Sequence, residues 1–331
     1  RRSFSNALML GRPRPWTLVR IIGGAALGAV LLWWVWQDVD NRALVDRLGD
    51  FPPVSLLIVI ALLLVSGVVR AYRWSLLFPS DRPPVTRLFL VENTGIGFNS
   101  VSPVRVLAEP VQIGYLALRY GYDAGAVLAS VVLVRVVDLV ITLSMIALGF
   151  LVFRPQVDVP GSVWGGIGIF ATVAVIVIGI SLQSGRTRFT DRLKFLDPYA
   201  GVWRELARRP IRLGAVVGMT AAFWIVKGAA AYVIVVGLDI DLSPPETHVL
   251  MLAVTTLGLT LPGLPSGLGP MEFAATFFLP FYGVGETDSL AFGLVLHGTF
   301  LLPPIAIAVA TLLVVGGPWP SGRAPGARAS E

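Results

Sequence analysis

The chain lacks cysteine altogether and has only two histidines, His248 and His297. A chain without thiols forms no disulfide, and so few imidazoles leave little material for a zinc site or a histidine-based catalyst. Lysine is also nearly absent, with only Lys194 and Lys227, so arginine carries most of the net charge of +6. These absences predict a protein without a metal site and without a cofactor.

Charged residues are scarce too. They make up 14% of the 331 residues, whereas 55% are hydrophobic and the mean hydropathy is +0.77. A soluble domain needs more charge than this to cover its surface. No segment is long and polar enough to form a separate soluble domain. We therefore expect a single all-α, polytopic membrane domain over residues 1–331.

Apolar blocks long enough to cross a bilayer predict about six full transmembrane helices. These cover residues 19–36, 54–69, 124–152, 162–182, 213–237 and 289–315. Lys and Arg concentrate in the cytoplasmic loops of membrane proteins. The basic linker 183–212 is therefore expected inside, and the acidic stretches 37–53 and 238–247 outside. The same rule puts both termini on the cytoplasmic side of a bacterial cytoplasmic membrane.

Two apolar stretches do not fit as ordinary spans. Residues 88–103 lie between two cytoplasmic segments and contain Glu92, Asn93 and Pro103, which suits a broken hairpin facing protein or water. Residues 248–284 split into two half-length pieces around a cluster of Pro and Gly, and either re-enter the membrane or cross it twice. The residues expected to break the two hairpins are Pro103, Pro262, Gly263, Pro265, Gly267 and Gly269.

Matching acidic and basic residues follow the two breaks. Glu109 precedes Arg135 by 26 residues, and Glu272 precedes His297 by 25. The two halves also start on opposite sides of the membrane, which predicts an inverted-topology repeat of the kind found in secondary transporters. The repeats would cover about residues 19–153 and 162–315. Chance similarity between two broken apolar stretches is the alternative.

Polar residues in these apolar stretches form the candidate site. A charge at the bilayer centre costs about 2.5–3.5 kcal/mol, so it should face the protein interior and have a partner. Arg135 and Asp138 share a helix face at i and i+3 and can pair, with Glu109 as a further partner of Arg135. Glu272 and His297 can pair in the second half. The predicted cavity-lining residues are Asn99, Arg105, Glu109, Arg135, Asp138, Lys227, Glu272 and His297.

Two interpretations of these groups stay open. In the first, the basic residues bind a phosphate headgroup and the acids balance their charge when the cavity is empty. Backbone N–H groups at the broken helix ends would assist. In the second, the same groups form a structural salt-bridge network that fixes the hairpins.

Two motifs resemble a known family. Residues 97–105 read GFNSVSPVR, residues 134–138 read VRVVD, and residues 261–272 read LPGLPSGLGPME. In this order they resemble the transmembrane domain of lysylphosphatidylglycerol synthases and their stand-alone flippase-like relatives. The resemblance covers nearly the whole chain and implies lipid translocation without a synthase domain. The chain departs from the family pattern at residues 108–112, which read AEPVQ where Gly-Glu-x-x-Arg is expected, and at His297, where Arg is usual.

We accordingly expect a flippase-like lipid transporter and not an enzyme. Its substrate would be a phospholipid or an isoprenoid-type lipid, anionic or phosphate-bearing, and no nucleic acid is expected as a partner. The chain has no ATP-binding motif. Gly24 and Gly28 have the small-residue spacing that allows close helix packing, which permits a homodimer.

Two other functions remain as alternatives. One is a membrane glycosyltransferase that uses a polyprenyl-phosphate sugar. In that case the acid pair Asp38 and Asp40, or Asp239 and Asp241, would hold a metal beside the phosphate. The other is a non-catalytic accessory subunit of a membrane complex.

Overall fold

The computed structural model describes most of the chain. The described residues are 15–37, 39–78, 82–102, 107–153, 161, 164–166, 168–169, 172, 208–261, 263–264 and 267–318. Every regular element among them is helical, which confirms the predicted all-α class. Most of the predicted span 162–182 and of the linker 183–212 lies outside the described residues.

Helices of very different lengths follow one another along the described chain. They are α1 (Pro15–Trp36), α2 (Asn41–Gly49), α3 (Pro53–Ser75), α4 (Val85–Val101), α5 (Ala108–Ile113), the π-helix η2 (Gly114–Arg119), α6 (Ala124–Val152), α9 (Pro210–Gly237), α10 (Pro244–Thr260), α11 (Pro270–Phe278), the 3₁₀-helix η6 (Leu279–Tyr282) and α12 (Glu286–Val314). Within the described residues, α3, α6, α9 and α12 are long and apolar enough to cross a membrane. A fifth span results if α1 and α2, which meet at 96°, are counted as one broken span.

Local sequence sets where several helices begin. Asp123 caps α6, because its carboxylate accepts the N–H of Ala126 at 2.8 Å. Glu246 accepts the N–H of Ser243 at 2.9 Å and so closes a capping box at the start of α10. Pro53 and Pro210 occupy the first position of their helices, where the missing N–H costs nothing.

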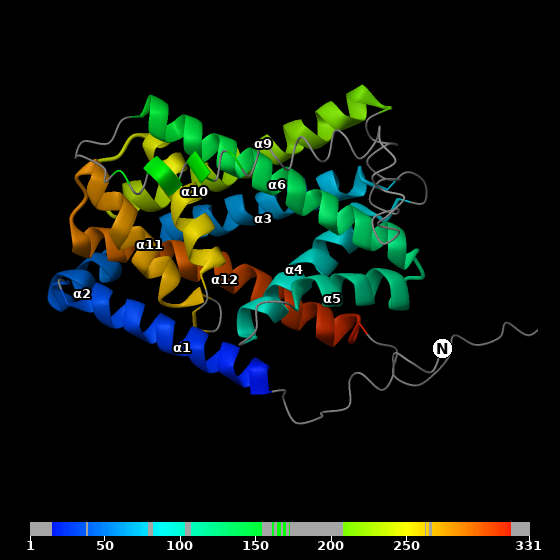
Figure 1. Ribbon diagram of the computed structural model, residues 1–331, viewed down its shortest axis with the longest axis horizontal. Coiled ribbons are helices and arrows are strands. Elements are labelled where there is room, and N and C mark those ends of the chain that lie inside the picture. Colours follow the sequence, from blue (N-terminus) through cyan, green and yellow to red (C-terminus); the bar gives the residue numbers. More distant parts are fainter. Residues whose placement is uncertain are drawn as a thin grey trace, which may run out of the picture.

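Two helical hairpins form where the sequence predicts breaks. The residue before a proline is disfavoured in the helical region. Accordingly, Ser102 (ψ 135°) ends α4 before Pro103, and Leu261 (ψ 139°) ends α10 before Pro262. The chain then turns back, so that α5 packs on α4 and α11 packs on α10. Figure 1 shows the pair α4–α5 toward one end of the molecule and the pair α10–α11 toward the other.

Glycines let the arms of each hairpin approach closely. A Cβ on Gly95 in α4 would lie 2.8 Å from the carbonyl oxygen of Ala108 in α5. A Cβ on Gly258 in α10 would likewise lie 2.8 Å from the Cα of Met271 in α11. The small residue is therefore required at both contacts.

Helix α1 covers the second break. A Cβ on Gly28 would lie 2.6 Å from the backbone nitrogen of Leu264, so α1 touches the backbone of the turn directly. Gly269 adopts φ +96° where α11 begins, a conformation that favours glycine. The small-residue spacing at Gly28 thus serves a contact inside the chain, while the predicted homodimer stays a prediction.

The buried apolar side chains of the described residues form two clusters. One joins α2, the end of α9, α10, α11 and the start of α12, and includes Leu250 and Phe292. The other joins the end of α3, α4, α5 and the start of α6 and α9, and includes Leu88 and Tyr115. Each cluster stabilises one hairpin, and the polar residues described next lie where the two clusters meet.

Candidate functional site

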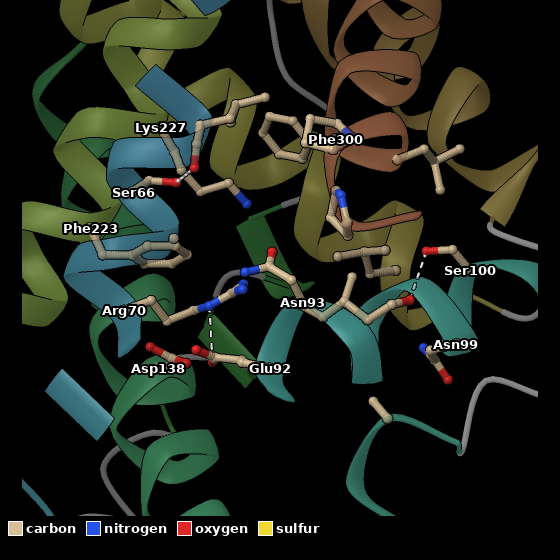
Figure 2. Close-up of a pocket in the computed structure, with 18 of the residues that line it drawn as sticks. Ser66, Arg70, Glu92, Asn93, Asn99, Ser100, Asp138, Phe223, Lys227 and Phe300 are labelled. Carbon is tan, nitrogen blue, oxygen red and sulfur yellow. Dashed lines mark hydrogen bonds and ion pairs between the residues drawn. The ribbon is translucent and has the colours of Figure 1, made fainter. Parts of the chain in front are cut away.

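A cavity of about 380 Å³ lies between the two hairpins (Figure 2). Residues of α4 and α5 line it from one hairpin, residues of α10 and α11 from the other, and α3, α6, α9 and α12 complete the wall. Its polar lining consists of Ser66, Arg70, Glu92, Asn93, Asn99, Ser100, Gln112, Arg135, Asp138, Lys227, His297 and Thr299. The volume is within the range of small-molecule sites, about 300–1,000 Å³.

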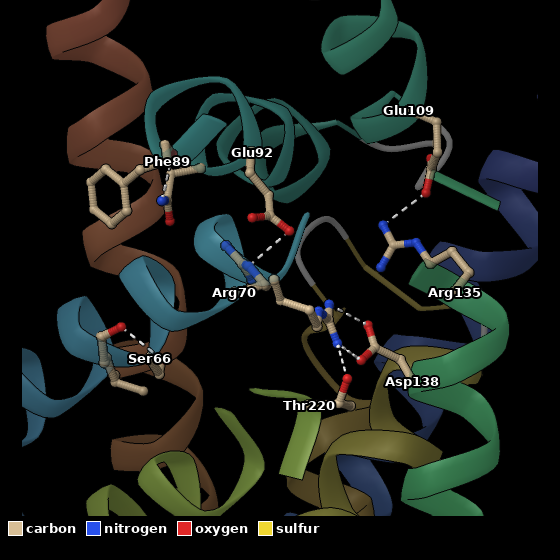
Figure 3. Close-up of polar contacts among 11 residues, drawn as sticks. Ser66, Arg70, Phe89, Glu92, Glu109, Arg135, Asp138 and Thr220 are labelled. Atoms are coloured by element: carbon tan, nitrogen blue, oxygen red, sulfur yellow. Dashed lines mark hydrogen bonds and ion pairs between the residues drawn. The ribbon is translucent and has the colours of Figure 1, made fainter. Parts of the chain in front are cut away.

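Two arginines, Arg70 (Figure 3) and Arg73, reach this region from consecutive turns of α3. Arg70 lies in the wall, with its Nε 2.9 Å from Oε1 of Glu92. Arg73 is almost fully buried and forms a two-pronged pair with Asp138, in which the Nη2–Oδ2 distance is 3.1 Å. Its Nη1 also donates to the hydroxyl of Thr220 at 3.1 Å.

The predicted pairing of Arg135 with Asp138 is wrong. Asp138 pairs with Arg73 from α3, because the two Nη groups of that guanidinium donate to the two oxygens of the carboxylate. Arg135 instead pairs with Glu109, as the sequence also predicted, with 2.8 Å between Nη2 and Oε1. The side chains of this second pair are 56% and 38% exposed, so it is far more accessible than the Arg73–Asp138 pair.

Lys227 enters the cavity from α9 without an acidic partner. Among the described residues, no carboxylate lies within ion-pair distance of its Nζ. Its Nζ lies instead 4.0, 5.1 and 5.3 Å from the ring centroids of Phe300, Trp224 and Phe223. These rings stabilise a cation through their electron-rich faces but leave its charge uncompensated. In the described part of the cavity wall, the amino group of Lys227 therefore has no carboxylate to balance a positive charge.

The pair Glu272 and His297 forms as predicted, with 2.7 Å between Oε1 and Nδ1. Glu272 is fully buried and its Oε2 accepts the N–H of Gly269 at 2.8 Å, so the carboxylate also fixes the start of α11. His297 lines the cavity, whereas Glu272 lies behind it. Asn99 makes a similar side-chain contact with the backbone at the first break, where its Oδ1 accepts the N–H of Leu107 at 3.2 Å.

The structure thus brings most of the predicted site residues together. Asn99, Arg135, Asp138, Lys227 and His297 line the cavity, and Glu109 and Glu272 contact it through their basic partners. Gly263, Gly267 and Gly269 lie in the turn between α10 and α11. Arg105, Pro103, Pro262 and Pro265 lie outside the described residues. Their roles in function stay predictions.

Sequence reasoning missed Arg70 and Arg73. The predicted span 54–69 stopped before both arginines and left them in the cytoplasmic segment that follows, whereas α3 continues to Ser75. Glu92 and Asn93 were recognised as polar but not as site residues. The signal that could have found the arginines was their i, i+3 spacing, which puts both on one face of an extended helix.

Asp40, one of the acids considered for a glycosyltransferase, has a structural role. Asp40 caps α2, where its carboxylate accepts the N–H groups of Arg42 and Ala43 at 2.9 and 3.2 Å. Asp38 lies outside the described residues. Across the described ranges, no group of three or more His, Asp or Glu side chains is arranged to hold a metal ion.

A comparison with models of protein families gives a match. The family model described as lysylphosphatidylglycerol synthase TM region matches residues 21–308. This range includes both hairpins and all the cavity residues named above. A comparison with curated proteins gives no match.

Proposed function

We propose that this chain, which belongs to the family of the lysylphosphatidylglycerol synthase transmembrane region, moves a phosphate-bearing lipid across the bilayer through the cavity. The family and the apolar helices make it a multi-pass membrane protein. In the proposal the chain transports the lipid without altering it chemically. The membrane is the bacterial cytoplasmic membrane, with both termini inside.

The observation that carries the proposal is the position of Lys227 in the cavity, where the described wall offers it no acidic partner. A buried cation of this kind is costly in a membrane, at about 2.5–3.5 kcal/mol on insertion scales. An anionic phosphate would supply the missing charge. The cavity is large enough for a headgroup but not for acyl chains. Two apolar side chains of its wall, Leu64 and Leu259, are 38% and 57% exposed, which would let the chains remain in the lipid.

The dimensions of the helices support an inverted repeat. The first arms of the hairpins, α4 and α10, both have 17 residues, and the helices that follow the hairpins, α6 and α12, both have 29. Arg135 and His297 are each the twelfth residue of their helix, and each pairs with an acid of the preceding hairpin.

Two similar halves of opposite orientation can exchange conformations and so open a shared site to each side in turn. In this proposal both hairpins are re-entrant. The pair α4–α5 enters from the cytoplasm, and the pair α10–α11 enters from outside. The break of each hairpin then lies near the middle of the bilayer, where the cavity would hold the headgroup.

A reconstitution assay tests the proposal. The full chain is placed in vesicles that contain tail-labelled phosphatidylglycerol, and dithionite quenching measures how fast the label leaves the protected leaflet. A tail-labelled polyprenyl phosphate tests the isoprenoid alternative in a parallel arm, and phosphatidylcholine gives the rate for a zwitterionic headgroup. We expect faster movement of at least one anionic lipid than in protein-free vesicles.

Variants of Lys227 make the assay specific. Lys227→Ala should reduce the movement of the anionic lipid to the protein-free rate, while Lys227→Arg keeps the charge and should retain most of it. If Lys227→Ala moves lipid as fast as the wild type, the proposal is wrong. Asp40→Asn serves as the control for the glycosyltransferase alternative, because it should leave lipid movement intact.

A further inference from the structure

We infer that Arg70 is a second phosphate-binding residue of the cavity and that Glu92 competes with the phosphate for it. The inference rests on the proposed function, since it concerns the same cavity and the same class of headgroup. It assigns Arg70 the role of ligand and Glu92 the role of a built-in competitor.

The guanidinium of Arg70 has unused donors. Its ion pair with Glu92 joins Nε to Oε1 at 2.9 Å, but Nε makes no hydrogen bond within the described part of the chain. Among the described residues, neither of its Nη groups makes a hydrogen bond. Arg73, one turn further along α3, uses both of its Nη groups on Asp138 and Thr220. Arg70 therefore keeps the forked face that binds phosphate with two parallel hydrogen bonds.

Arg70 and Lys227 both lie close to the ring of Phe223. The guanidinium carbon of Arg70 lies 5.8 Å from the centroid of Phe223, and the Nζ of Lys227 lies 5.3 Å from the same centroid. Both residues line the cavity, as Figure 2 shows. Each is also the eighteenth residue of its helix, α3 or α9. One headgroup between them could contact both cations.

Only one of the two carboxylate oxygens of Glu92 has a partner among the described residues. Its side chain is 9% exposed, its Oε1 faces Arg70, and its Oε2 is buried with no hydrogen-bond partner among the described residues. A buried carboxylate oxygen without a partner is costly, so this ion pair is weaker than the Arg73–Asp138 pair. It neutralises Arg70 in the empty cavity and can be displaced by a phosphate.

In the second repeat, the position of α10 that matches Glu92 in α4 has no carboxylate that could compete with the phosphate. Glu92 is the eighth residue of α4, and the eighth residue of α10 is Met251. A phosphate can therefore bind Lys227 without displacing a carboxylate, whereas it must displace Glu92 to bind Arg70. A transporter gains from this difference, because a headgroup held by two uncompensated cations would be released slowly.

The competition predicts an unusual result for one variant. Glu92→Gln removes the competing charge, so it should bind phosphatidylglycerol about tenfold more tightly, the factor that one charge-assisted hydrogen bond contributes. It should also move the lipid more slowly, because release becomes limiting. Arg70→Lys keeps the charge but loses the fork, and should bind the lipid about tenfold more weakly than the wild type.

Binding is measured on the full chain in detergent, by fluorescence titration with tail-labelled phosphatidylglycerol and with phosphatidylcholine as the zwitterionic comparison. The matched control is Asp288→Asn, which removes the acid of another Arg–carboxylate pair, Arg47–Asp288, at 3.0 Å and outside the cavity. This control should bind lipid like the wild type. Thermal unfolding of each variant confirms that it is folded.

The two proposals fail differently. If Glu92→Gln is folded and binds phosphatidylglycerol no more tightly than the wild type, the inference is overturned, even when Lys227→Ala stops transport. If Glu92→Gln does not fold, Arg70→Lys decides, and unchanged binding in that variant overturns the inference. If both variants bind as expected but no protein moves lipid, the inference stands and the proposed function is wrong.

Discussion

Breaking the pair formed by Arg73 and Asp138 should cost more stability than breaking any other ion pair in the described part of the chain. The side chain of Arg73 is 1% exposed and that of Asp138 is 19% exposed. Removing one partner of a buried pair leaves an uncompensated charge and costs about 3–5 kcal/mol. Because Asp138 is partly exposed and Thr220 remains as an acceptor for Arg73, we expect the lower end of that range for Asp138→Leu. A loss of about 3 kcal/mol corresponds to a factor of roughly 150 in the folding equilibrium.

Chemical denaturation in detergent, followed by tryptophan fluorescence, measures this cost. The double variant Arg73→Met/Asp138→Leu removes both charges, and apolar replacement of a whole buried pair is often neutral. We therefore expect it to recover most of the lost free energy of unfolding. Glu109→Gln breaks the exposed pair with Arg135 and should cost less than about 1 kcal/mol.

Two results would contradict this reasoning. In the first, Asp138→Leu is as stable as Glu109→Gln, which would require Arg73 to be solvated without its partner, although its side chain is buried. In the second, the double variant is less stable than Asp138→Leu alone. The second result would mean that the stabilisation comes from packing around Arg73 and not from the ion pair.

The remaining predictions concern the breaks and the exposed pair. Gly28→Ala should lower the thermal unfolding temperature, because its Cβ would meet the backbone nitrogen of Leu264 at 2.6 Å, whereas Gly23→Ala has nothing within 4 Å and should be tolerated in the same measurement. Glu109→Gln, although folded, should stop lipid movement in the vesicle assay, since it leaves Arg135 free to hold the phosphate. Wild-type movement in that variant would remove Glu109 from the site.

The helix breaks could be predicted because their cause is local. A residue before proline is disfavoured in the helical region, and Ser102 and Leu261 end their helices where the sequence predicts, although α12 continues through Pro303 and Pro304. The pairing of Glu109 with Arg135 was also predictable, because the same spacing recurs in the second half. The breaks depend on two neighbouring residues, and the ion pair was found because a similar spacing occurs in both halves.

The partners of Asp138 and Arg70 could not be predicted in the same way. Arg73 lies 65 residues before Asp138, and no local pattern shows that α3 and α6 bring them together. Sequence spacing alone favoured Arg135 as the partner of Asp138, but Arg135 pairs with Glu109. Hydropathy also ended the predicted span 54–69 too early, because a buried arginine lowers the apolar average as much as a loop arginine does.

The two acid–base pairs at matching positions differ in burial, and the choice of base follows that difference. The Arg135–Glu109 pair is exposed, and an arginine can remain charged there because solvent shares the cost. The His297–Glu272 pair is 5% and 0% exposed, where two permanent charges would be expensive. Arginine cannot lose its charge in a protein, whereas histidine also has an uncharged form. The departure from arginine at position 297 thus goes together with the deeper burial of the second pair.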